Sequence, residues 1–544
     1  MRNIMKWSMS FVAGIAMAIA GSASTGHADQ PKQGGTMVVS YFDDTTTLDP
    51  AIGYDWQNPS MMQALFDGLM DYEPGTTKLT PDLAESVDVS TDGLTYTFTL
   101  RQGVKFHNGR ELTSADVKYT LERLANPATR SPGQSYFSSI AGFDELAAGT
   151  SDGLSGVETP DAYTVIIRMS RATAPFLNVL AMHFGSIVPR EEVERWGDDF
   201  GHHVVGTGAF RLTEWTAGQR LVFDRNEDYF KPGVPYLDKI VFEIGQDPTV
   251  VLLRLQQGEI DIAGDGIPPA QYVEMTTGDA TKDLVVLSDQ LQTGYVTLNT
   301  TMPPFDNVLV RQAVNMAINK ANVVRIINNR AVPANQALPP LMPGHDPSHG
   351  GYPFDPDKAR ALLAEAGHPD GFETELYAMN VDPNPRIAQA IQQDLANVGI
   401  TASVQSLSQA VVIDAGGQGS APMLWSGGMA WISDFPDPSG FYWPILGCDS
   451  AVPGGWNWAK YCNQALDDRA AKADAMVDPA LAAQRTEEWR GIFLDAMKDA
   501  PWVPIFHDKG VLIHSARIGG DNQFFVSPVH IPIWYDYLYA KDAQ

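Results

Sequence analysis

The sequence is poor in cysteine and in positive charge, and it has no long internal hydrophobic run. Its 544 residues include two cysteines, and 65 acidic residues stand against 37 lysines and arginines, giving a formal net charge of −28. Such an excess of negative charge repels nucleic acid and anionic lipid, so we expect no nucleic-acid partner. No internal stretch approaches the roughly 20 uninterrupted apolar residues that a membrane-spanning helix needs.

The sequence also lacks the short motifs of common catalytic and cofactor sites. It has no G-x-S-x-G elbow, no H-E-x-x-H zinc motif, no Walker A loop, and no G-x-G-x-x-G that opens a helix after a strand. We therefore expect neither a cofactor nor a metal site. An enzyme is not excluded by these absences, because catalytic triads assemble from distant positions.

The two cysteines, Cys448 and Cys462, lie close together in the chain. In an oxidising compartment, an isolated even pair at this spacing predicts a disulfide, whose closed loop is worth about 3 kcal/mol in the chain-entropy model. The alternative, a redox-active or zinc-binding pair, lacks the C-x-x-C spacing. Because Cys448 is the first cysteine, none near the N-terminus could carry a lipid anchor.

Residues 1–28 have the pattern of a signal peptide. A basic start is followed by the apolar stretch Trp7–Ala20 and by small residues up to Ala28, which suits cleavage before Asp29. Cleavage after Ala23 and an uncleaved membrane anchor are the alternatives. We expect the mature protein to lie in the periplasm without a lipid anchor.

Short apolar strands alternate with amphipathic helices along the rest of the chain. Thr36–Phe42 has the pattern of a first strand, and Thr113–Ala125 that of a helix with a polar cap. Asn307–Asn329 predicts a long helix, with a possible break near Asn319, and residues 355–407 predict helix, strand, helix and strand. This alternation predicts the α/β class.

A loop in the last quarter of the chain places two carboxylates among aromatic residues. It reads "AWISDFPDPSGFYW" and contains Asp434 and Asp437. The pair could be an acid/base pair, a metal site or a clamp for a cationic ligand. Residues three apart on a helix would suit a retaining glycosidase, so a secreted hydrolase is one hypothesis. Pro436 and Pro438 argue against a regular helix through the pair.

Several segments spread along the chain match the pattern of one known family. They are Leu83–Leu124, Val205–Ile244, Leu255–Ile262, Pro304–Val324, Asp355–Phe372 and the region from Asp434 past both cysteines. Together they resemble the solute-binding proteins of peptide-type ABC importers, the dipeptide/oligopeptide-binding family, which is family 5 of the extracellular solute-binding proteins. The segments occur in the order of that family and cover nearly the whole chain after residue 28.

The resemblance implies a two-lobed type II periplasmic-binding-protein fold with a hinge between the lobes. Lobe I would comprise residues 29–290, with an extra subdomain inserted at about 70–203. Lobe II would comprise residues 291–508, and residues 509–544 would return to lobe I. Such a receptor holds a small molecule or short peptide between its lobes and delivers it to a membrane ABC permease. It would be monomeric and would catalyse no reaction.

The resemblance also implies ligand contacts. In peptide-binding members, the aspartate of a W-x-x-D-x-x-x-P stretch accepts the α-ammonium group of the ligand, and Asp434 is at that position. A buried ammonium group must be paired with a charge, which fits this role. Asp437 is interpreted as a turn residue or the start of a helix. The other predicted ligand contacts are the aromatic residues Trp431, Phe435, Trp425, Trp56 and Tyr295.

One departure from the family pattern leaves the ligand open. Dipeptide binders carry an arginine for the ligand's carboxylate in an aromatic-rich loop, whereas the corresponding loop here, Tyr377–Arg386, has no arginine before the helix begins. The group that holds the other end of the ligand is therefore unassigned. Longer peptides, oligosaccharides or amino sugars, opine-like compounds and metal chelates are the candidate solutes. A periplasmic chaperone or a signalling receptor with the same fold is a further hypothesis.

Overall fold

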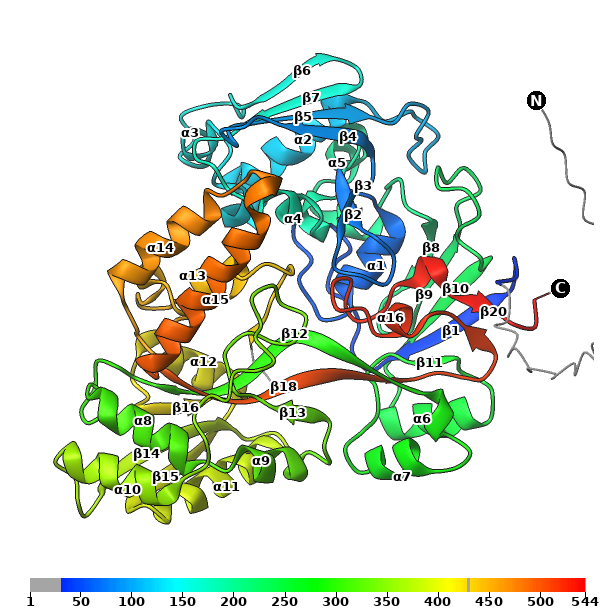
Figure 1. The fold of residues 1–544 in the computed structure, drawn as a ribbon. Helices are drawn as coiled ribbons and strands as arrows, with labels where there is room; N and C mark the ends of the chain where they lie inside the picture. The colour runs from blue at the N-terminus through cyan, green and yellow to red at the C-terminus, as the bar shows by residue number, and fades with distance from the viewer. Residues whose placement is uncertain (1–30, 428–430, 544) are drawn as a thin grey trace, which may run out of the picture. The chain divides into compact units, whose positions relative to one another are not determined.

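A computed structural model describes residues 31–427 and 431–543. The predicted signal peptide, residues 1–28, lies outside the described residues. Within the described ranges, no helix combines the length and the apolar character that crossing a bilayer requires. Helices and strands alternate along these ranges, so the predicted α/β class is confirmed (Figure 1).

The first large sheet is formed mainly by the N-terminal half of the chain. Its order is β11–β1–β10–β9–β8, in which β1 runs parallel to β10 and β11, and β8, β9 and β10 are antiparallel. Its strands are β1 (Thr36–Tyr41), β8 (Phe210–Thr216), β9 (Arg220–Arg225), β10 (Lys239–Ile244) and β11 (Ile262–Ala263). The predicted first strand is confirmed by β1.

The second large sheet is formed by later parts of the chain, in the order β13–β18–β12–β16–β14–β15, with β17 paired to β12. Its strands are β12 (Val285–Leu298), β13 (Ala331–Pro333), β14 (Phe372–Met379), β15 (Ile400–Leu407), β16 (Met423–Trp425), β17 (Trp431–Ile432) and β18 (Trp502–Ile513). Helices α8 (Val308–Ala317), α9 (Lys320–Ile326), α10 (Pro356–Glu365) and α11 (Asn384–Ala396) accompany it.

The two long strands β12 and β18 connect the two large sheets. They pair in antiparallel fashion from Val285 opposite Ile513 to Thr297 opposite Trp502. At one end, an isolated bridge joins the chain after β18 to β11 of the first sheet, and at the other end β12 pairs with β16. Figure 1 shows this ribbon crossing from one sheet to the other.

A third sheet forms a separate layer with its own core. It has the order β4–β5–β7–β6 and consists of β4 (Ala84–Val89), β5 (Thr95–Leu100), β6 (Val157–Asp161) and β7 (Thr164–Arg168). Helix α2 (Ser114–Ala125) packs on it through buried Val117, Leu121 and Leu124. All these elements lie within residues 70–203, where the inserted subdomain is predicted.

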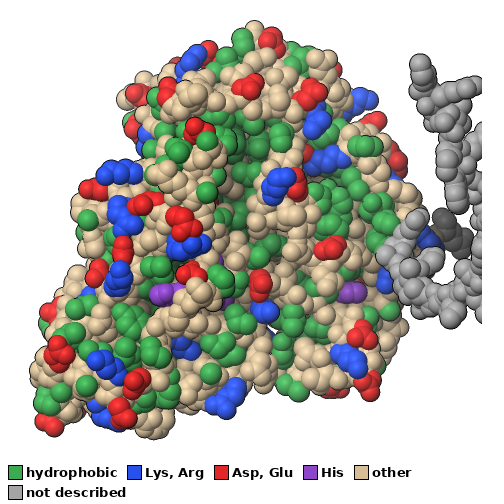
Figure 2. Space-filling view, viewed as in Figure 1, with side chains coloured by type: hydrophobic (Ala, Val, Ile, Leu, Met, Phe, Trp, Pro, Cys, Tyr) green, Lys and Arg blue, Asp and Glu red, His purple; other side chains and the backbone are tan. Residues whose placement is uncertain are grey.

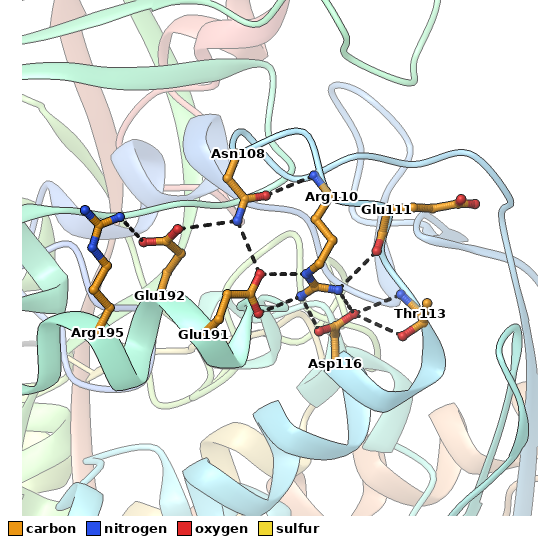
Figure 3. A network of polar contacts seen from close by, with 8 residues as sticks. All are labelled: Asn108, Arg110, Glu111, Thr113, Asp116, Glu191, Glu192 and Arg195. Atoms are coloured by element: carbon orange, nitrogen blue, oxygen red, sulfur yellow. Dashed lines mark hydrogen bonds and ion pairs between the residues drawn. The ribbon is translucent and has the colours of Figure 1, made fainter.

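Polar contacts fix the start of α2 to α5 (Arg190–Trp196). Arg110 donates from Nη2 to Asp116 at 2.6 Å and from Nε to Glu191 at 2.6 Å, so its guanidinium bridges the two helices (Figure 3). Thr113 and Asp116 form a capping box at the start of α2. The polar cap predicted for this helix is confirmed.

The predicted helix over residues 307–329 is broken where the sequence indicated. Helix α8 ends at Ala317 and α9 begins at Lys320, because the Asn319 side chain accepts a hydrogen bond from the backbone N–H of Asn322 and so caps a new helix. The backbone N–H of Asn319 donates instead to the Asp394 carboxylate on α11. A local cap and a tertiary contact therefore both end α8.

The remaining elements surround these sheets. The helices are α1 (Asn58–Leu65), α3 (Phe143–Ala147), α4 (Phe176–Leu180), α6 (Pro248–Gln256), α7 (Tyr272–Thr277), α12 (Gln409–Gln418), α13 (Ser439–Ile445), α14 (Gln464–Asp474), α15 (Ala482–Lys498) and α16 (Asn522–Phe525). The short strands are β2 (Met70–Tyr72), β3 (Leu79–Pro81), β19 (Ile518–Gly519) and β20 (Tyr539–Ala540). On the face drawn in Figure 2, acidic and basic side chains are interspersed.

Candidate ligand-binding site

A cavity of about 230 Å³ lies between segments that are far apart in the sequence. It is lined by residues from 54–72, 181–186 and 528–531, by Asp82, and by residues 432–434. The cavity therefore brings the predicted anchor Asp434 together with α1 and β2. Among the described residues that line it are five aspartates and no lysine or arginine.

The segment that carries Asp434 is held on β12. Strand β17 pairs with β12, the backbone N–H of Ser433 donates to the Leu291 carbonyl at 2.9 Å, and the Ser433 hydroxyl donates to the Phe435 carbonyl at 2.7 Å. These contacts fix the backbone on both sides of Asp434. The carboxylate is thus presented to the cavity by a fixed segment.

Two tyrosine hydroxyls donate to the Asp434 carboxylate. Tyr54 donates to Oδ1 at 2.6 Å, and Tyr136 donates to Oδ2. Burial raises the pKa of Asp434, and the two hydrogen bonds oppose that shift because they favour the charged form. Burial and the adjacent carboxylate raise the pKa of both tyrosines, which keeps them as donors. Among the described residues, no lysine or arginine forms an ion pair with Asp434.

Aromatic contacts hold these tyrosines. The Phe184 ring lies 5.5 Å from that of Tyr54 and 6.3 Å from that of Tyr136, and Phe435 meets Tyr136 edge-on at 6.2 Å. Neither tyrosine was predicted from the sequence to lie at the site. Tyr54 lies two residues before Trp56, so the stretch that predicted Trp56 as a ligand contact could also have indicated Tyr54. Tyr136 is 298 residues from Asp434, and no local pattern links the two.

The predicted aromatic contacts divide into two groups. Trp56 is 48% exposed and lines the cavity, whereas Phe435 is buried and contacts the Tyr136 ring without lining the cavity. Trp431 is half-buried, and its indole N–H donates to the Gly440 carbonyl at 2.9 Å. It therefore braces the loop that follows Asp434.

Trp425 and Tyr295 lie in hydrophobic cores and do not line the cavity. The Trp425 indole donates to Asn384 Oδ1 at 3.0 Å, and Tyr295 stacks on Trp502 with ring centroids 4.2 Å apart. Both are buried, because the strands that carry them, β16 and β12, lie inside the second sheet. In this structure they support the sheet next to the site.

Asp437 does not act together with Asp434. Its carboxylate pairs with Arg485 at 2.7 and 2.9 Å and accepts the backbone N–H of Ser439 at the start of α13, as the turn interpretation predicted. Arg485 also donates to Asp474 at 3.1 Å. Burial and the nearby Asp437 charge raise the pKa of Asp474 to about 6. This buried ion-pair group anchors the loop, and it was not predicted from the sequence.

Arg386, the arginine nearest to the family's carboxylate-binding position, is engaged elsewhere. It pairs in bidentate fashion with Asp382 at 2.7 Å for both contacts, and both side chains are about half exposed. Neither residue lines the cavity. The structure therefore shows no arginine at the far end of this cavity among the described residues.

Buried acidic groups form another wall of the cavity. Asp67, Asp71 and Asp82 line it, and the ammonium group of Lys231 lies 3.6, 3.8 and 2.7 Å from their respective carboxylates. His530 Nε2 lies 2.6 Å from Asp71 Oδ1. The members of this group come from four separate segments, so no local pattern in the sequence predicted it.

Cys448 and Cys462 form the predicted disulfide. Within residues 31–427 and 431–543, no group of three or more His, Cys, Asp or Glu side chains is arranged to hold a metal ion.

Comparisons with known proteins give a consistent result. A family profile described as "Bacterial extracellular solute-binding proteins, family 5 Middle" matches residues 78–452. The glutathione-binding protein GsiB of Salmonella paratyphi A is 31% identical over 500 residues, which cover 90% of this chain and 92% of that protein.

Solved structures agree over almost the full length. The periplasmic binding protein DppA of Helicobacter pylori, in complex with the peptide STSA, is 27% identical with a TM-score of 0.76, covering 94% of this chain and 99% of that one. Clavulanic acid biosynthesis oligopeptide binding protein 2 is 26% identical with a TM-score of 0.83, covering 94% and 96%. The predicted two-lobed α/β fold is confirmed, whereas the lobe boundaries stay predictions.

Proposed function

The chain belongs to the bacterial extracellular solute-binding proteins of family 5, and from that premise we propose that it captures a short peptide or peptide-like solute through an α-ammonium group at Asp434. Proteins of this family bind solutes for ABC importers in the periplasm. The glutathione-binding and peptide-bound relatives support a peptide-like solute for this chain.

The observation that carries the proposal is the state of Asp434. It lines a cavity, burial raises its pKa, and its hydrogen-bond donors are two phenols rather than a cation. A carboxylate has about four acceptor sites, so a third donor can join the two hydroxyls. A ligand ammonium group would supply the missing positive charge, and its own charge would be satisfied in return.

The lobes are proposed to comprise residues 29–290 with 509–544, and residues 291–508. On this division, β12 and β18 carry the hinge, and the hydrogen bonds from Tyr54 and Tyr136 to Asp434 join the two lobes. Ligand binding would then favour the closed form, because the anchor and its tyrosine donors come from opposite lobes.

The remaining parts of the proposal follow from this role. The mature protein would act as a monomer, free in the periplasm after removal of residues 1–28, and would release its solute to a permease complex without transforming it. Asp434 then serves as a charge anchor and not as a catalytic acid, in keeping with the separate ion pair of Asp437.

Native mass spectrometry of freshly purified mature protein tests the proposal, with isothermal titration calorimetry for candidate short peptides. We expect a stoichiometric adduct of peptide-like mass, or saturable 1:1 binding with no change in the peptide after prolonged incubation. Repeated consumption of a bound solute, or binding restricted to compounds without an ammonium group, would overturn it.

A further inference from the structure

The acidic wall of this cavity, formed by Asp67, Asp71 and Asp82, has more carboxylates than cationic protein partners. Four buried carboxylates belong to it, since Asp536 lies beside Asp67, Asp71 and Asp82, and each of the four is at most 7% exposed. Lys231 is the lysine that pairs with them. Four carboxylates therefore share one lysine and the His530 imidazole as their basic side-chain partners among the described residues.

A surplus of carboxylates over cations is energetically unfavourable at a buried position. An unpaired buried carboxylate either takes up a proton or finds a cation, because the charged form is poorly solvated there. Burial raises the pKa of Asp67 and Asp82, with neighbouring aspartates adding to the effect, and raises that of Asp536 to about 7. Protons thus replace part of the missing positive charge.

A second feature of this wall that indicates a ligand is a pair of buried hydrogen-bond acceptors without donors. Gln63 lines the same cavity, is 9% exposed, and donates from Nε2 to Asp536 Oδ2 at 3.0 Å. Its Oε1 and the Asp536 Oδ1 have no hydrogen-bond partner among the described residues. Two buried acceptors without donors therefore lie beside three carboxylates that line the cavity.

The hydroxyl groups that donate to this wall leave some acceptor sites of its carboxylates unused. Asp67 accepts hydrogen bonds from Thr207 at 2.8 Å and from Tyr229 at 2.9 Å, whereas the side-chain partner of Asp82 among the described residues is the Lys231 ammonium group at 2.7 Å. A carboxylate accepts about four hydrogen bonds, so Asp82 has room for a second cationic donor.

Resting on the proposed function, we propose that the solute is a basic peptide: its α-ammonium group binds Asp434, and a lysine or arginine side chain binds at the wall formed by Asp67, Asp71, Asp82 and Gln63. Both sites line one cavity, so one short ligand can reach them together. An ammonium or guanidinium group supplies several N–H donors and the missing positive charge.

The lining of the cavity makes acidic ligands unfavourable. It contains five aspartates and, among the described residues, no lysine or arginine to receive a ligand carboxylate. A side-chain carboxylate would meet charge of its own sign, so selectivity would come from repulsion of acidic peptides as well as attraction of basic ones.

Calorimetric titration of the mature protein with matched tripeptides tests this inference. Tri-alanine is the parent, and one residue, the second or the third, is replaced by lysine, glutamine or glutamate. We expect one lysine peptide to bind about 30-fold or more tighter than its glutamine counterpart, which corresponds to the lower end of the cost of a buried unpaired charge. The glutamate peptide should bind more weakly than either.

The Asp82→Asn variant locates the effect. It keeps the size of the side chain and removes one charge, and we expect the lysine preference to fall to a few-fold. Glu365→Gln removes the same charge from an exposed position on α10 and should keep the full preference. Should Asp82→Asn fail to fold, the wild-type peptide series decides alone.

The outcomes distinguish failure of the basic-peptide inference from failure of the proposed function. Equal affinities for the lysine, glutamine and glutamate peptides would overturn the basic-peptide inference and leave the proposed function intact, since all three carry the α-ammonium group. A lysine preference unchanged in folded Asp82→Asn would overturn the assignment to this wall. Failure of every peptide to bind would overturn both proposals.

Discussion

Replacement of Asp434 by asparagine should weaken ligand binding without weakening the fold. The substitution keeps the side-chain shape and an acceptor for one tyrosine hydroxyl, but it removes the charge that pairs with the ligand. Removing one partner of a buried charge pair costs about 2–5 kcal/mol, so affinity for a peptide with a free α-ammonium group should fall by about 30-fold to several thousand-fold.

The same substitution should leave the stability of the ligand-free protein unchanged or increase it. Burial raises the folded-state pKa of Asp434, so the stability that its protonated form contributes is lost as the pH rises through that pKa. Above that pKa the buried charged carboxylate destabilises the ligand-free protein, and asparagine removes this charge. We expect a melting temperature equal to or higher than that of the wild type.

The assay pairs the variant with a chemical change in the ligand. Calorimetry on wild type and Asp434→Asn would use one peptide with a free α-amino group and the same peptide acetylated there. The free peptide should lose affinity in the variant, whereas the acetylated peptide should bind both proteins weakly and alike. Equal losses for both peptides, or unchanged affinity for the free one, would refute the ammonium assignment.

Four further predictions follow from particular contacts. Arg485→Met should lower the free energy of unfolding by about 3–5 kcal/mol in urea titrations, because it leaves two buried carboxylates without their cation. A loss below about 1 kcal/mol would contradict a stabilising role of this buried ion pair. Because burial raises the pKa of Asp536 from 3.8 to about 7, its contribution to stability is lost as the pH rises between these values. As the pH increases from 4 to 8, the free energy of unfolding of Asp536→Asn should therefore rise relative to that of wild type, by up to about 4 kcal/mol. A difference in melting temperature that does not change with pH would argue against the raised pKa of Asp536. The double variant Cys448→Ser with Cys462→Ser should unfold with about 3 kcal/mol less free energy, and reduction of wild type should reproduce the loss. A C-terminally amidated peptide should bind at least as tightly as the free acid, because no lysine or arginine lines the described cavity; a large loss would reveal a carboxylate anchor elsewhere.

Local patterns explain why much of the fold was predictable. The helix over residues 114–125 begins after a threonine cap with an aspartate three positions later, and the break at Asn319 reflects a side chain that caps a new helix. Such signals depend on neighbours a few residues away, so they can be read without the fold. The disulfide was predictable for the same reason, because its cysteines are 14 residues apart.

The candidate site was predictable only where a motif marked it. Asp434 was found through the spacing of its aromatic and proline neighbours in a family pattern. Trp425 and Tyr295 have the same chemistry as Trp56, yet they are buried in cores while Trp56 is 48% exposed at the cavity. Residue type alone does not distinguish an aromatic ligand contact from an aromatic core residue, because both uses favour large apolar rings.

The sequence by itself determined the α/β class and the family, and it predicted Asp434 as a charged anchor, since these inferences depend on periodicity, caps and motifs within short windows. Only the tertiary structure decided what surrounds that anchor. Tyr136 reaches Asp434 across 298 residues, and the acidic wall draws on segments from Gln63 to Asp536. Which buried charges share a cavity depends on how sheets and helices pack, and that packing decides which of them find a partner of opposite charge.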